Sequence, residues 1–79
     1  MSGQNPPLDC RQVKRILAHF GFKLCGGKGS HENYSASING RFRKVTVDCP
    51  KEPFTGDLLK SMVAQSGLTR KQWYDALEA

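Results

Sequence analysis

Hydrophobic and polar positions follow a helical period at both ends of the chain and an alternating period in the middle. In the first helical run, apolar residues are spaced i, i+3, i+4 and i+7, at Val13, Ile16, Leu17 and Phe20. This spacing predicts an amphipathic helix. Asp9 stands where an N-cap is expected, and Gly21 stands where a helix commonly ends.

The middle of the chain predicts three strands. Residues 22–25 alternate, and we expect Phe22 and Leu24 to point inward. Residues 31–38 and 41–48 flank the dipeptide Asn39-Gly40, which strongly favours a two-residue hairpin turn. The three segments together predict an antiparallel sheet.

A two-residue turn would also fix the register of this hairpin, and therefore its two faces. The pairs expected under the helices are Ile38 with Arg41, Tyr34 with Val45, and Glu32 with Val47. The pairs expected on a polar, open face are Ser37 with Phe42, Ser35 with Lys44, Asn33 with Thr46, and His31 with Asp48. A one-residue bulge would exchange the two faces.

The last third of the chain predicts two helices. Two prolines within residues 49–54 end the sheet, and Thr55 is placed to cap a helix with apolar residues Leu58, Leu59, Met62 and Val63. Thr69 and Gln72 form the pattern of a capping box for a third helix. We therefore predict one α+β domain over residues 8–79, of order α-β-β-β-α-α with helices on one face of a three-stranded sheet. Residues 1–7 are predicted to be a disordered lead-in.

Composition narrows the classes of function. The 79 residues include 12 Lys and Arg against 7 Asp and Glu, a formal charge of +5. Most of these bases precede residue 50, which favours a polyanionic partner such as a nucleic acid; the alternative is a solvated basic surface without a partner. No signal peptide and no membrane-spanning segment are predicted, so we expect a cytoplasmic protein.

Cysteines and histidines could in principle form disulfides or bind zinc. Three cysteines at wide spacings do not form the disulfide framework of a small secreted protein. Together with the two histidines they lack the spacing of a zinc site. We therefore predict reduced cysteines, no metal and no cofactor.

The candidate chemistry lies in residues 26–30, a glycine-rich loop in this prediction, and in His31. A nucleotide-binding loop needs contiguous Gly-Lys-Ser/Thr opening a helix, but here Gly29 separates Lys28 from Ser30 and a strand follows. Glycines can still align successive amides into an anion-binding concavity beside Lys28, with a phosphodiester as its ligand. The alternative is a flexible connection between two strands.

The stretches KGSHENY, VTV and GDLLKSMVAQSGLTRKQWYDAL resemble the HicA toxin family, small endoribonucleases that cleave messenger RNA and pair with a HicB antitoxin. The resemblance extends from Leu8 to Leu77. It implies a double-stranded-RNA-binding-like fold and the toxin function of a type II toxin-antitoxin system. It also implies two partners, mRNA and a HicB-like antitoxin. The catalytic residue would be His31 of the Gly-Ser-His triplet.

The mechanism that this resemblance implies needs no metal. His31 would take the proton from a ribose 2′-hydroxyl, because the ordinary pKa of histidine lies close to neutral. The attacking oxygen would then form a cyclic phosphate, and cations and amides around the histidine would stabilise the phosphoryl oxygens. The residues expected to bind RNA are Lys28, Gly29, Ser30, Lys44 and Arg43.

One position departs from the family pattern. After VTV the family usually has a proline and, two positions on, a second histidine, whereas this chain has Asp48, Cys49 and Pro50. An alternative function is therefore a non-catalytic RNA- or protein-binding module of the same fold. Asp48 itself has two interpretations: it lies across from His31 and orients the ring, or it begins the turn before Pro50.

Overall fold

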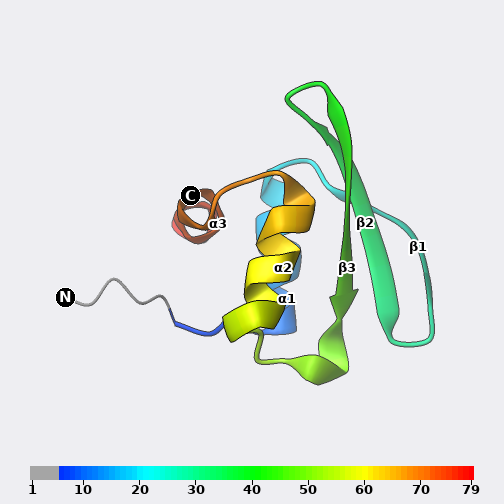
Figure 1. The fold of residues 1–79 in the computed structure, drawn as a ribbon, viewed down its shortest axis with the longest axis vertical. Helices are drawn as coiled ribbons and strands as arrows, with labels where there is room; N and C mark the ends of the chain where they lie inside the picture. The colour runs from blue at the N-terminus through cyan, green and yellow to red at the C-terminus, as the bar shows by residue number, and fades with distance from the viewer. Residues whose placement is uncertain (1–5) are drawn as a thin grey trace.

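The computed structural model describes residues 6–79. Its elements are α1 (Cys10–His19), β1 (Lys23–Lys28), β2 (His31–Ile38), β3 (Arg41–Asp48), the 3-10 helix η1 (Cys49–Lys51), α2 (Gly56–Ser66) and α3 (Arg70–Ala76). The strands form one antiparallel sheet in the order β1-β2-β3. The helices lie beside β3, and β1 is the strand farthest from them (Figure 1). The predicted α+β arrangement is confirmed.

The β2-β3 hairpin has the predicted turn and register. Asn39 and Gly40 both have positive φ, 54° and 79°, as a type I′ turn requires. His31 is opposite Asp48, and every other predicted pair is also present. Because the register holds without a bulge, the assignment of residues to the two faces of this hairpin is correct.

One face of the sheet packs against the helices and forms the core. Val45 and Val47 of β3 are completely buried there. Leu8, at the predicted start of the domain, is also buried and pairs with Phe54 in an isolated β-bridge. The other fully buried large hydrophobic side chains are Val13, Ile16, Leu17, Phe54, Leu59, Met62 and Trp73.

Two of the three predicted N-caps are formed by side chains. Asp9 and Gln12 make reciprocal bonds at the start of α1, and Thr69 makes the predicted capping box at the start of α3. Thr55 occupies the N-cap position of α2, but its side chain makes no capping bond. The capping role predicted for the Thr55 side chain is therefore wrong.

A buried hydroxyl joins the two C-terminal helices. Ser66 is fully buried and donates to the carbonyl of Val63 at 2.6 Å. The same oxygen accepts from the indole N–H of Trp73 at 2.9 Å and from the amide of Leu68 at 3.1 Å. Since every polar group here has a partner, the serine is accommodated in the core and fixes α3 against α2.

The first strand differs from the prediction. It continues to Lys28, with an irregularity between Leu24 and Gly26, instead of ending at Cys25. Leu24 faces the same side as its partner Tyr34, but its side chain is 62% exposed because the helices do not extend over β1. The predicted inward direction of Leu24 is therefore correct, but the burial that it implied is not. Leu58 of α2 is also more exposed than predicted.

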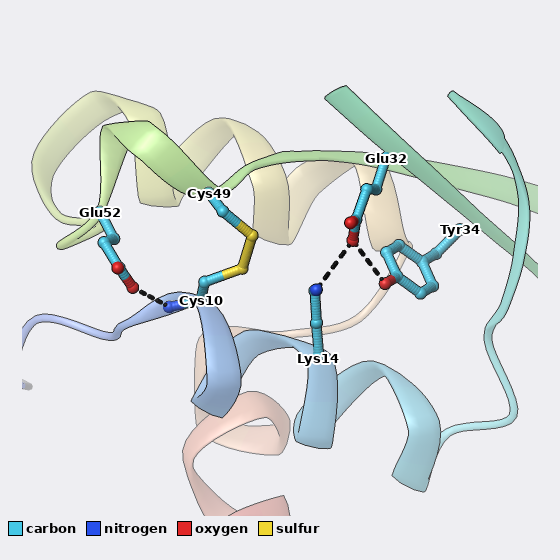
Figure 2. Close-up of polar contacts among 6 residues, drawn as sticks. All are labelled: Cys10, Lys14, Glu32, Tyr34, Cys49 and Glu52. Atoms are coloured by element: carbon cyan, nitrogen blue, oxygen red, sulfur yellow. Dashed lines mark hydrogen bonds and ion pairs between the residues drawn. A yellow bond between two sulfur atoms is a disulfide. The ribbon is translucent and has the colours of Figure 1, made fainter. Parts of the chain in front are cut away.

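The cysteine prediction also needs correction. Cys10 and Cys49 form a disulfide with a Cα–Cα distance of 5.2 Å, and Cys25 is the free, exposed cysteine. The bond joins the start of α1 to η1, where Glu52 also accepts from the amide of Cys10 at 2.6 Å (Figure 2). The pairing could not be seen from sequence because 39 positions separate the two cysteines and only the tertiary fold brings them together.

Part of the predicted lead-in, residues 1–5, lies outside the described residues. The carbonyl of Pro6 accepts from the Tyr74 hydroxyl at 2.6 Å, so the first described residue contacts α3. In the part of the chain described here, no helix combines the length and apolar character that a bilayer crossing requires.

Candidate functional site

The turn before His31 is tighter than predicted. Lys28 pairs directly with His31, so only Gly29 and Ser30 form the connection, and Gly26 and Gly27 belong to β1. The loop predicted over residues 26–30 is therefore mostly strand. Gly29 has φ +63°, and a Cβ on Gly27 would collide with the carbonyl oxygen of His31. A side chain at position 27 would therefore displace the backbone that carries the histidine.

Asp48 lies against the histidine. The Nε2 atom of His31 is 3.2 Å from Oδ2 of Asp48 across the β2-β3 pair. The hydroxyl of Ser30 donates to Oδ1 of the same carboxylate at 3.0 Å. Lys51 completes the group, with its ammonium 4.0 Å from Oδ2. The interpretation in which Asp48 orients His31 is thus supported by geometry, although Asp48 also precedes η1, as the turn interpretation expected.

These contacts leave one histidine nitrogen available for chemistry. A carboxylate beside Nε2 favours the tautomer with its proton on that nitrogen. In the neutral ring Nδ1 then carries the free lone pair. The His31 side chain is 57% exposed and that of Asp48 only 15%. The carboxylate is therefore mostly covered, while the ring that it contacts remains accessible. This arrangement suits a general base for a large, exposed substrate.

Cations surround this group on the open face. Residues directly opposite one another in a sheet share a face, so Lys28, His31 and Asp48 form one row across the three strands. Another row on the same face contains Lys23, Ser35 and Lys44, with Ser35 four residues after His31 along β2. Lys23 and Lys51 were absent from the predicted site. The register of β1 would have revealed Lys23. Lys51 could have been suggested by its position three residues after Asp48.

Arg43 does not belong to this face. It alternates with Lys44 along β3 and therefore faces the helices, where its guanidinium packs against the backbone of Gly67. Its Nε is buried and has no hydrogen-bond partner among the described residues. The structure therefore separates Arg43 from the other residues predicted to bind RNA. His19, at the end of α1, contacts the edge of Phe20 and is likewise apart from the row containing His31.

A second polar group lies on the helix side of the sheet. Lys14 is 2.9 Å from the Glu32 carboxylate, which also accepts from the Tyr34 hydroxyl at 2.8 Å (Figure 2). The bond to Lys14, followed by that to Tyr34, lowers the pKa of Glu32. The same bond to Glu32 raises the pKa of Lys14. Desolvation, then the bond to Glu32, raises the pKa of Tyr34. These contacts join α1 to β2, and each of the three side chains is bonded within the group.

Within residues 6–79, no group of three or more His, Cys, Asp or Glu side chains is placed to bind a metal ion. No family model, curated protein or solved structure matches the chain. The site must therefore be interpreted from its own geometry: an exposed histidine held by a carboxylate at one end of a lysine-bearing sheet face.

Proposed function

We propose that this protein is an endoribonuclease that needs no metal and uses His31 as its general base. The observation that carries the proposal is the contact between Nε2 of His31 and Asp48 at 3.2 Å on an exposed face. It leaves Nδ1 as the ring nitrogen with the free lone pair, on a side chain that is 57% exposed. Lys28 in the same row supplies positive charge beside the histidine.

The reaction follows from these positions. Nδ1 of His31 accepts the proton of a ribose 2′-hydroxyl, and the 2′ oxygen forms a bond to the adjacent phosphorus as the bond from phosphorus to the 5′ oxygen breaks. The products are a 2′,3′-cyclic phosphate and a 5′-hydroxyl, whose proton comes from water because the site is open. Asp48 stabilises the imidazolium that forms, and Lys28 stabilises the charge that grows on the phosphoryl oxygens.

The biological role proposed with this activity is that of a type II toxin. Support comes from the resemblance of the Gly-Ser-His triplet and the C-terminal helices to the HicA family. The substrate would be mRNA, and a HicB-like antitoxin would cover the open face and block His31. A saturated complex with such a partner should therefore be inactive on RNA, and full cleavage by that complex would contradict this part of the proposal.

A second candidate function is RNA binding without catalysis. It is favoured by one observation: the open face carries a single histidine, since His19 belongs to α1. A second histidine that could protonate the leaving oxygen is therefore not part of this face. The lysine rows would still bind phosphates in such a protein.

Cleavage by matched histidine variants separates the two functions. Wild type, His31→Ala and His19→Ala are compared on a long single-stranded RNA in EDTA, and RNA binding is measured in parallel. We expect His31→Ala to lose cleavage by 100-fold or more, in line with the roughly 10²–10⁴-fold contribution of general acid–base catalysis, while binding persists. His19→Ala should cleave normally. Binding by all three proteins without cleavage by any of them would favour the second function.

A further inference from the structure

The open face extends well beyond the proposed catalytic group. Its cross-strand rows run from the end of the sheet at Asp48 to the Asn39-Gly40 hairpin. In order along the strands they are Lys28, His31 and Asp48; Gly26, Asn33 and Thr46; Lys23, Ser35 and Lys44; and Ser37 with Phe42. None of the residues in these rows is buried.

Charge on this face favours a polyanion. Lys23, Lys28 and Lys44 are all exposed, and none of the three is in an ion pair among residues 6–79. The one carboxylate in the rows, Asp48, is already in contact with His31 and Ser30. Such a face is complementary to a phosphate backbone and lacks the opposing charges that protein interfaces often use for register.

An exposed aromatic ring marks the other end of the face. The side chain of Phe42 is 72% exposed, the largest value among the exposed large apolar residues of the described chain. It lies in the last row, six residues along β2 from His31, a separation of about 20 Å at a strand rise of about 3.3 Å per residue. An aromatic ring beside a row of lysines is the arrangement on which unpaired bases stack.

We propose that this face binds single-stranded RNA along a track from the His31 row to Phe42, with an unpaired base stacked on the Phe42 ring. The inference rests on the proposed function for its catalytic end. It assigns the substrate class, because a base in a duplex cannot present its face to the ring. At a stacked rise of about 3.4 Å per nucleotide the track holds at most about six nucleotides.

Binding and cleavage of RNAs of two lengths test the track. Affinity for a fluorescent single-stranded 10-mer should fall by about 5- to 150-fold in Phe42→Ala, because base stacking on an aromatic ring contributes about 1–3 kcal/mol. Cleavage of a dinucleotide, too short to reach the ring, should be unchanged. Leu24→Ala is the matched control, because Leu24 is similarly exposed but lies on the other face, and both of its measurements should equal wild type.

The salt dependence of RNA affinity distinguishes the contribution of the Phe42 ring from that of the lysines. Removing the phosphate contact of Lys44 with Lys44→Ala should reduce the slope of log K against log salt by about 0.7, whereas Phe42→Ala should leave the slope unchanged. Equal RNA affinities for wild type and Phe42→Ala would overturn the track and indicate that the ring contacts a protein partner. The binding measurements do not depend on cleavage. A protein that binds RNA along the face without cutting it would lose affinity in Phe42→Ala, whereas a nuclease that does not use the face would keep its affinity in that variant.

Discussion

Asp48→Asn is the substitution that isolates the contribution of the carboxylate to the proposed reaction. Asparagine has the same shape, and its side-chain oxygen can still accept from the Ser30 hydroxyl, which now donates at 3.0 Å. The substitution removes the negative charge 3.2 Å from the histidine and, with the oxygen held by Ser30, places an amide N–H donor against Nε2, which favours the tautomer with its proton on Nδ1. The charge matters most when His31 has taken a proton, so its loss should act on the chemical step and not on RNA binding.

The distance gives the size of this effect. Two unit charges 3.2 Å apart interact by about 1.3 kcal/mol in water, the appropriate lower limit for a half-exposed ring. A hydrogen bond to a charged group reaches about 3 kcal/mol. At 1.36 kcal/mol per factor of ten, kcat should fall by roughly 10- to 100-fold. The free energy of unfolding should change by less than about 1 kcal/mol, because the two charged partners of Asp48, His31 and Lys51, are 57% and 64% exposed and solvent screens their interaction with the carboxylate.

The assay is single-turnover cleavage of RNA by wild type and Asp48→Asn, with RNA affinity and thermal unfolding measured beside it. Asp75→Asn is the matched control: it removes the same charge from an ion pair, Lys71–Asp75 at 2.7 Å, on α3. It should leave kcat unchanged. Wild-type kcat in Asp48→Asn would refute the orienting role, as would a loss confined to RNA affinity.

Three further predictions concern the structure that supports the site. Loss of the disulfide in Cys10→Ser should lower the free energy of unfolding by about 4 kcal/mol in the chain-entropy estimate for a separation of 39 residues; Cys25→Ser is the control, and identical unfolding of the two variants in a non-reducing buffer would show that no disulfide forms. Gly27→Ala should destabilise the fold by about 1–3 kcal/mol more than Gly26→Ala in urea titrations, because the two glycines have similar φ, 153° and 159°, and only a Cβ at 27 meets the His31 carbonyl. Glu32→Gln should be less stable than wild type at pH 7. Folding lowers the pKa of Glu32 below its ordinary value near 4.5, so the stabilisation is present above that value and is lost as the pH falls through the folded-state pKa. The difference between the two proteins should therefore vanish at low pH, and a difference that persists there would exclude the ion pair as its source.

Local patterns were sufficient for most of the fold. The Asn39-Gly40 turn determined the β2-β3 register, and with it the side of the sheet on which His31, Lys44 and Phe42 lie. Helical spacing and capping residues located all three helices. These features depend on neighbours in sequence, so a sequence can reveal them directly.

Most of the errors came from contacts between distant segments. Leu24 follows a strand alternation, but no helix covers β1, so its side chain remains exposed. The disulfide and the proximity of Lys51 to Asp48 depend on the path of the chain through η1. Arg43 is a local error: the predicted register already places Lys44 on the open face, so alternation along β3 sends Arg43 to the helix face, against Gly67.

The identity of the product ends tests the central claim most directly. Wild-type protein is incubated with a single-stranded RNA in EDTA, and the termini of the fragments are determined by mass spectrometry. Attack by a 2′-hydroxyl activated by His31 predicts fragments that end in a 2′,3′-cyclic phosphate and begin with a 5′-hydroxyl, and these should be missing with His31→Ala. Fragments with a 5′-phosphate, or the same fragments from His31→Ala, would contradict the account.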